Sequence, residues 1–155
     1  MARDTKENTM REIVLYIHGK NGAAAESEHY APLFPGDKVI GLDYQTFTPW
    51  ETGREILDTV LNLQETHGNV TLIANSIGAF FSMNAGIDAM IRRAYFISPI
   101  YGENDNLTSS ETMRAFAERH NAALTVMKGG EHWFHTEEQM RFLDNWIRKG
   151  EGAIR

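Results

Sequence analysis

The sequence contains no cysteine, and this absence excludes several kinds of protein. Without cysteine there is no disulfide framework, no thiolate metal site and no thiol nucleophile. No window approaches the roughly 20 consecutive apolar residues that a membrane-spanning helix needs. Basic residues form no cluster, and the net charge is −6. Both facts argue against a nucleic acid or an anionic membrane surface as the partner.

The 155 residues otherwise have the composition of an ordinary globular protein, with 42% hydrophobic and 23% charged residues. A chain of this length can bury a substantial core within one domain. Residues 1–10 are polar and lack the apolar core of a signal peptide. We therefore expect a flexible tail over residues 1–10 and a single domain over residues 11–155, in a cytoplasmic protein.

Short apolar runs alternate with amphipathic stretches along the chain. Five segments have the apolar and β-branched content of buried strands: residues 11–17, 37–42, 70–74, 94–97 and 123–127. Helices are expected over residues 23–30 and 77–91. Three more are expected to start at capping-box patterns, which begin at Thr52, Thr108 and Thr136. This alternation predicts an α/β fold, a three-layer α/β/α sandwich whose mostly parallel sheet has about five strands in the order 2-1-3-4-5.

The tight connection between the third strand and the next helix carries Ser76. Only Asn75 and Ser76 are available to reverse the chain there, so the serine hydroxyl should point outward at the carboxyl edge of the sheet. Ala74 and Gly78 are small, as the close approach of strand and helix requires. The pattern is a nucleophile elbow with alanine in place of the first glycine of G-x-S-x-G. The alternative role of Ser76 is a helix N-cap.

A serine nucleophile needs a base, and an acid that orients the base. His132 follows the last expected strand in a double-glycine loop, which favours it over His135, next to the expected cap of the final helix. Asp105 is the expected acid, because Ser, Asp, His is the chain order of the hydrolase elbow fold. Asp43 and Glu103 remain alternatives to Asp105.

The oxyanion of a tetrahedral intermediate requires hydrogen-bond donors. The backbone N–H of Ile77 follows the nucleophile, and the N–H of Lys20 lies in the loop after the first strand, where Gly19 allows close approach. That loop lacks the spacing of a phosphate-binding P-loop. His132 and His135 have no obvious third partner for a metal ion. No metal and no cofactor are expected.

Four segments together resemble the α/β-hydrolase superfamily, and among its members the small single-domain bacterial serine esterases. They are Tyr16-Ile-His-Gly19, Ala74-Asn-Ser-Ile-Gly78, Tyr101-Gly-Glu-Asn-Asp105 and Gly129-Gly-Glu-His132. The resemblance implies Ser76 as nucleophile, Asp105 as acid and His132 as base in hydrolysis of an ester-like bond. Further residues expected around the substrate are His18, Gly19, Asn75, Tyr101 and Trp133.

The sequence departs from this superfamily after the fourth strand. In the relatives it resembles, a strand and the helices of a lid normally separate that strand from the Tyr-Gly-Glu loop. Here Ser98-Pro-Ile100 runs directly into Tyr101. We therefore expect a reduced fold with an open site, and uncovered apolar surface that could form a homodimer interface.

The predicted function is a serine hydrolase that cleaves small, short-chain carboxylic esters through a Ser76-His132-Asp105 triad and an acyl-enzyme intermediate. A thioesterase or an amidase would use the same residues. The alternative from another class is a non-catalytic binding protein that keeps the fold with an incomplete triad. A flavodoxin-like nucleotide binder would share the strand order, but nothing in the loops indicates it.

Overall fold

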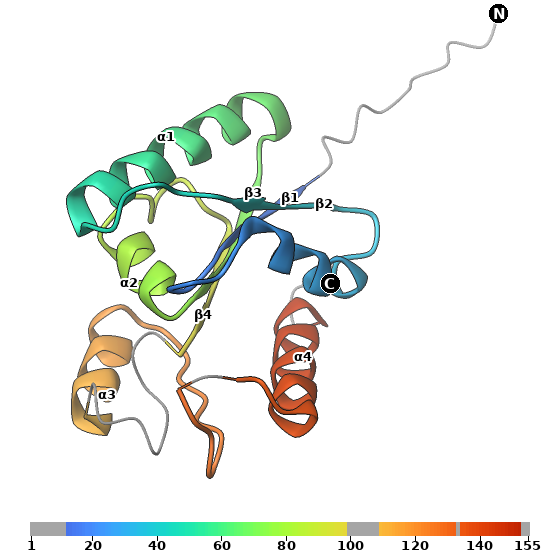
Figure 1. The fold of residues 1–155 in the computed structure, drawn as a ribbon, viewed down its shortest axis with the longest axis vertical. Coiled ribbons are helices and arrows are strands. Elements are labelled where there is room, and N and C mark those ends of the chain that lie inside the picture. The colour runs from blue at the N-terminus through green and yellow to red at the C-terminus, as the bar shows by residue number, and fades with distance from the viewer. Residues whose placement is uncertain (1–11, 99–108, 133, 153–155) are drawn as a thin grey trace, which may run out of the picture.

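The computed structural model describes residues 12–98, 109–132 and 134–152, and these form an α/β fold around a four-stranded parallel sheet (Figure 1). The strands are β1 (Ile13–Ile17), β2 (Lys38–Leu42), β3 (Val70–Asn75) and β4 (Arg93–Ile97). The helices are the 3₁₀ helix η1 (Ala24–Leu33) and the α-helices α1 (Pro49–His67), α2 (Ile77–Met83), α3 (Ser110–Arg119) and α4 (Glu137–Gly152). The sheet order is β2-β1-β3-β4 with every pair parallel. This confirms the first four positions of the expected order.

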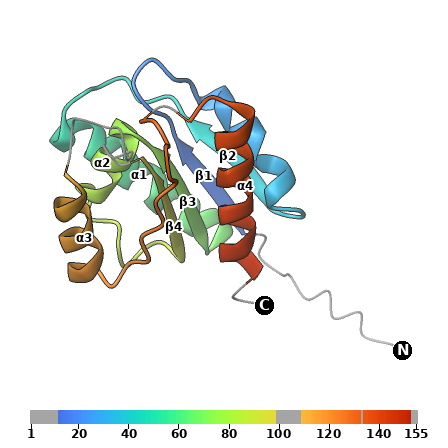
Figure 2. The same cartoon turned by 90° about the horizontal axis from the view of Figure 1, so that it is seen from below.

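The central strand β1 is buried on both faces, as its uninterrupted apolar run predicts. Successive side chains of a strand point to opposite faces, so β1 contributes to two apolar clusters. Ile13, Leu15 and Ile17 pack with residues of α1 and α2. Val14 and Tyr16 pack with residues of η1 and α4. Helices therefore cover both faces of the sheet, as Figure 2 shows.

The first long helix begins one turn before its expected start. Thr48 caps α1: its Oγ1 accepts from the Glu51 N–H at 3.2 Å and donates to the Glu51 carboxylate at 2.7 Å. Pro49 occupies the first turn, where a missing N–H costs nothing. Thr52 is instead buried and donates to Thr46 O. The expected cap at Thr52 is therefore wrong, because the equivalent Thr–Glu pair four residues earlier caps the helix.

The other two capping boxes have different outcomes. Thr136 Oγ1 accepts from the Gln139 N–H at 3.2 Å, and Gln139 Oε1 accepts from the Thr136 N–H at 3.3 Å. The box at Thr136 is thus confirmed. Thr108 lies outside the described residues, and α3 is capped by Ser109, whose Oγ accepts from the Thr112 N–H.

The helix after Ser76 is shorter than the apolar run predicts. It ends at Met83 rather than near residue 91, and Gly86 follows with φ +70°. Glycine adopts this left-handed conformation without steric cost, so it turns the chain out of the helix. Ile87 is nevertheless fully buried. The apolar content of residues 84–91 thus reflects burial in turns, not a continued helix.

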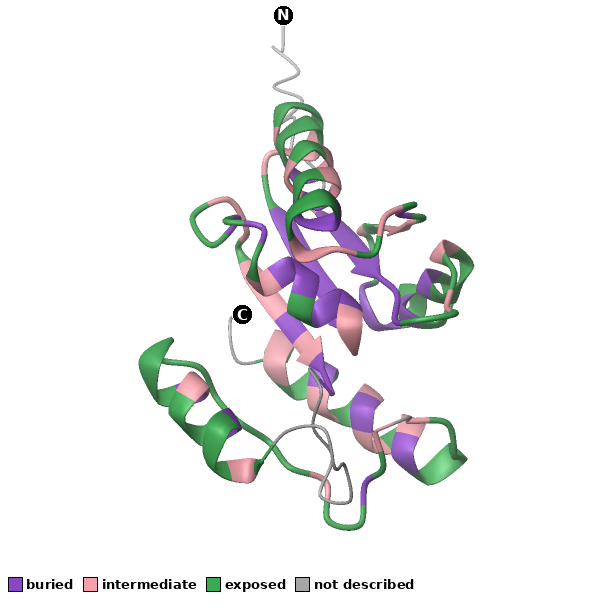
Figure 3. Cartoon of the chain, turned by 60° about the vertical axis from the view of Figure 1, so that its left-hand side comes forward, coloured by how far each residue is buried: buried purple, intermediate pink, exposed green. Residues whose placement is uncertain are grey.

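The expected fifth strand does not form: residues 122–127 contain no strand. In the described part of the chain, β4 is the last strand of the sheet. Leu124 and Val126 are 39% and 44% exposed. Both α3 and the segment that follows it in sequence are largely exposed (Figure 3). Side chains of an apolar pocket stand between β4 and residues 122–127. No strand ladder joins these two segments in the described part of the chain.

Among the helices of residues 12–98, 109–132 and 134–152, none combines the length and the apolar character required to cross a membrane.

The close packing of η1 on β2 generates the first prediction. A Cβ at Gly41 would overlap the backbone of Ala24, so we expect Gly41→Ala to lower the free energy of unfolding by about 1–3 kcal/mol. Gly152→Ala is the matched control, because a Cβ there meets nothing within 4 Å. Urea unfolding of both variants measures the difference, and equal stability of the two would contradict the predicted clash.

Candidate active site

The loops that follow β1, β3 and β4 meet at the carboxyl edge of the sheet. β1 leads into Gly19 and Lys20, β3 leads into Ser76, and β4 ends beside Ser98. Parallel strands place their carboxyl ends on one edge, which is where sites form in α/β proteins. His132 joins them from the loop between α3 and α4. The described part of the site is therefore assembled from four separate segments.

Ser76 has a backbone conformation that is rare for a residue with a side chain. Its φ is 53° and its ψ is −122°. Its N–H donates to Ile97 O of β4 at 2.9 Å, and its carbonyl accepts from the Ala79 N–H at 3.1 Å. These bonds hold the chain between β3 and α2. Backbone strain of this kind costs about 1–3 kcal/mol and persists only where surrounding structure enforces it.

The two glycines predicted to permit close packing do so. A Cβ at Gly78 would overlap the carbonyl oxygen of His18 and contact Ile17. A Cβ at Gly19 would lie 3.2 Å from Ser76 Cβ. Any larger residue at position 78 would push α2 away from the end of β1. The small residues therefore allow Ser76 to sit directly beside the β1 loop.

Ser76 and His132 lie within hydrogen-bond distance of each other, although 56 residues separate them in sequence. Ser76 Oγ is 2.7 Å from His132 Nε2. In the tautomer that protonates Nδ1, the serine hydroxyl donates to Nε2. This is the arrangement in which an imidazole can accept the serine proton.

The Ser–His pair opens into a cleft of about 920 Å³. Four of the expected residues besides the pair line this cleft: Gly19, Lys20, Asn75 and Ile77. The backbone groups expected to donate to an oxyanion thus border the same space as Ser76 Oγ.

His18 does not line the cleft, contrary to its expected place beside the substrate. Its ring is buried and stacks on Tyr44 with 4.3 Å between ring centroids. His18 Nδ1 is 2.7 Å from Gly19 O, and its own carbonyl accepts from the Tyr44 hydroxyl. These contacts give His18 a structural role in holding the loop after β1.

Two rivals for catalytic roles are engaged elsewhere. Asp43 Oδ1 accepts from the Ala24 N–H at 2.8 Å, at the start of η1. His135 Nδ1 lies 3.9 Å from the Glu131 carboxylate. The expected acid Asp105 and the expected substrate contacts Tyr101 and Trp133 lie outside the described residues. Within residues 12–98, 109–132 and 134–152, no three potential ligands cluster to hold a metal ion.

A tyrosine–glutamate pair in the cleft was not anticipated. The Tyr16 hydroxyl donates to Glu26 at 2.6 Å, and the same carboxylate accepts from the Ala23 N–H at 3.3 Å. Glu26 thereby joins β1 to the loop that carries Lys20. The sequence offered one weak signal, a polar ring in an otherwise aliphatic strand, but the partner on η1 depends on tertiary packing.

Burial, and next the hydrogen bond to Glu26, raises the pKa of Tyr16 well above its ordinary value of 10.0. Above about pH 10 the unfolded chain therefore loses this proton while the folded protein keeps it. We expect the free energy of unfolding to be unaffected below about pH 10 and to fall as pH rises beyond it. Tyr16 contributes about 1.4 kcal/mol to this fall for each pH unit above about pH 10.

Urea unfolding across pH 8 to 11 tests this in the protein and in Tyr16→Phe. The variant should lose stability less steeply with pH, because one titrating group is gone. Identical slopes for the two proteins would contradict the raised pKa of Tyr16.

The strain at Ser76 gives a separate prediction. Ser76→Gly should be more stable than Ser76→Ala by about 1 kcal/mol, because glycine relieves positive φ and its flexibility in the unfolded chain offsets part of the gain. At Ser110 in α3 the order should reverse, since glycine is a poor helix former. Urea unfolding of the four variants measures both differences. The same order at both sites would show that Ser76 is unstrained.

Comparison with protein-family models finds none that matches the chain, and comparison with curated proteins finds no match. The fold class follows from the structure itself. It is an α/β fold with a four-stranded parallel sheet, which is compatible with an α/β-hydrolase-like fold. Any assignment of activity therefore depends on the geometry at the carboxyl edge of the sheet.

Proposed function

We propose that this protein is a serine hydrolase that cleaves carboxylic esters, with Ser76 as nucleophile and His132 as general base. The observation that carries the proposal is the 2.7 Å contact between Ser76 Oγ and His132 Nε2. It occurs at a residue with φ 53° between a parallel strand and a helix, the local geometry of a nucleophile elbow. A serine that only capped a helix would need neither the strain nor the imidazole.

The reaction would proceed in two halves. Ser76 Oγ attacks the carbonyl carbon while its proton moves to His132 Nε2. The bond from carbon to the leaving oxygen then breaks, and that oxygen takes the proton from Nε2, which releases the alcohol. Water attacks the acyl-enzyme in the same way, gives its proton to Nε2, and leaves the carboxylic acid and a regenerated Ser76 hydroxyl.

The negative charge of the tetrahedral intermediate requires donors that are already in place. Backbone N–H groups of Lys20 and Ile77 are proposed for this role. Both residues border the cleft, and Gly19 brings the Lys20 loop against Ser76. The Ile77 N–H is in the first turn of α2, where N–H groups have no acceptor within the helix.

Asp105 remains the proposed acid that would orient the His132 ring. Its rival Asp43 already accepts from the start of η1 and lies at the end of β2, with β1 between β2 and the strand that carries Ser76. Thioesters and amides would pass through the same steps at the same residues. Esters are proposed ahead of amides because an alkoxide leaves more readily than an amide anion, and ahead of thioesters because the sequence resembles serine esterases.

A fluorophosphonate probe tests the nucleophile directly. The protein should be labelled on Ser76, because only an activated serine displaces the leaving group at phosphorus, and labelling should vanish in Ser76→Ala. Mass spectrometry of the labelled peptide identifies the site. Ser110→Ala, in the first turn of α3, is the matched control and should label normally.

Turnover of p-nitrophenyl acetate gives the second measure of the same proposal. Ser76→Ala and His132→Gln should each lower kcat by at least about 10³-fold. A nucleophile and its base act as one unit, so the loss of either removes most of the rate enhancement that the two supply together. Circular dichroism establishes that the variants remain folded. Unchanged hydrolysis by folded Ser76→Ala would refute the assignment and favour a non-catalytic binding protein.

A further inference from the structure

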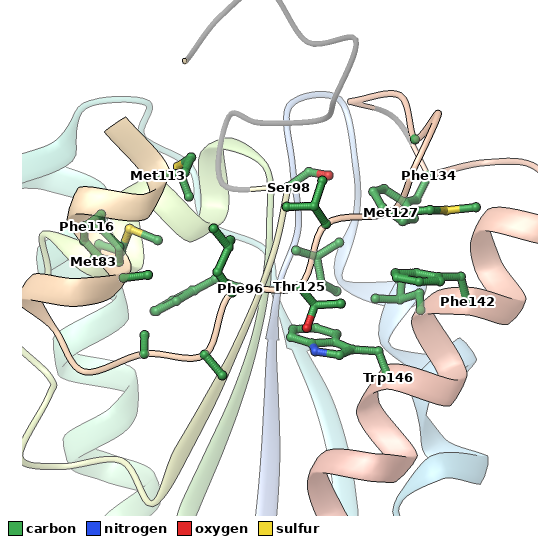
Figure 4. A pocket seen from close by; sticks show the side chains of 18 residues that line it. Met83, Phe96, Ser98, Met113, Phe116, Thr125, Met127, Phe134, Phe142 and Trp146 are labelled. Atoms are coloured by element: carbon green, nitrogen blue, oxygen red, sulfur yellow. The ribbon is translucent and has the colours of Figure 1, made fainter. Parts of the chain in front are cut away.

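A second, smaller pocket of about 110 Å³ lies between β4 and residues 122–127, at the place where the fifth strand was expected (Figure 4). Side chains from four elements and the 122–127 segment surround it. Its aromatic wall residues are Phe96, Phe116, Phe134, Phe142 and Trp146, and Met83 and Met113 line it as well. Side chains of β4 and of residues 122–127 thus face a common apolar space.

The wall of this pocket suits an apolar ligand. None of its described lining residues carries a charge. Three of them are methionines (Met83, Met113 and Met127), whose flexible side chains adapt to irregular shapes. Transfer of an apolar group from water into an apolar pocket of this kind is favourable.

The pocket adjoins the cleft of Ser76. Ile97, Phe134 and Leu143 line both spaces. Ile97 also holds the nucleophile, because its carbonyl accepts the Ser76 N–H at 2.9 Å. These shared residues place the pocket next to an acyl group attached to Ser76 Oγ.

Ser98 contributes a buried polar group to the wall of the pocket. It is 7% exposed, lines the pocket, and has φ 41°. Within the described residues, its hydroxyl has no hydrogen-bond partner. A buried hydroxyl without a partner is costly, and a ligand atom able to form a hydrogen bond beside Ser98 would remove that cost.

We propose that this pocket is the acyl-binding subsite of the hydrolase, an inference that rests on the proposed function of Ser76. A cavity of about 150 Å³ holds a benzene molecule, so a pocket somewhat smaller than that takes an acyl chain of about four to six carbons. The preferred substrates are then esters of medium-length acids, longer than acetate. Decanoate exceeds the pocket.

A series of p-nitrophenyl esters tests the chain length. Each methylene buried should raise kcat/KM about fourfold, so hexanoate should exceed acetate by at least about tenfold, and decanoate should fall below hexanoate. Thr125→Phe places a ring in the pocket, whose lining includes Thr125 and Trp146 (Figure 4). That variant should lose the preference for hexanoate over acetate.

Thr66→Phe is the matched control, an exposed threonine on α1 that lines neither space. It should behave as the unmodified protein does. Equal kcat/KM for acetate and hexanoate, or an unchanged hexanoate preference in Thr125→Phe, would overturn the subsite.

Binding to Ser76→Ala separates this inference from the proposed function. Hexanoic acid brominated on its terminal carbon should quench the fluorescence of Trp146, because bromine quenches on contact. The quenching should disappear with Thr125→Phe and with Trp146→Phe, and persist with Thr66→Phe. Absent quenching overturns the pocket even if Ser76 is labelled by fluorophosphonate, whereas quenching without labelling keeps the pocket and refutes the hydrolase.

Discussion

The hydrogen bond from the Ser76 N–H to Ile97 O is the constraint on which the rest of the site depends. It ties the turn after β3 to the neighbouring strand while the backbone of Ser76 is held at φ 53°. Gly78 completes this constraint, since only a residue without Cβ can pass the His18 carbonyl. Strain at one residue is maintained because three strands and α2 would have to move together to release it.

The same constraint links the proposed nucleophile to the proposed acyl subsite. The backbone carbonyl of Ile97 accepts from the Ser76 N–H, and Ile97 lines both the cleft and the apolar pocket. β4 is the last strand of the described sheet, so its outer side is open to side chains instead of a fifth strand. The position where the strand is missing thus becomes a space that a ligand can occupy.

Much of the site was predictable because its signals are local in sequence. A strand, a two-residue turn and a following glycine indicated Ser76, and a histidine in a double-glycine loop indicated His132. Their meeting at 2.7 Å was not predictable in the same way, because the strand expected before His132 does not form and the loop between α3 and α4 carries the histidine to Ser76. The burial of His18 against Tyr44 and the bond between Tyr16 and Glu26 were not predictable, because both depend on side chains brought together from distant segments.

The sequence by itself determined the alternation of strands and helices, because burial periodicity and turn residues act locally. It also determined the parallel order of the first four strands and the place of Ser76 at their carboxyl edge. Tertiary structure decided the start of α1 at Thr48, the end of α2 at Met83 and the absence of a strand over residues 122–127. A capping box competes with its neighbour for one helix start, and an apolar run is buried equally well in turns. A strand, finally, forms only where another backbone edge lies within hydrogen-bonding distance.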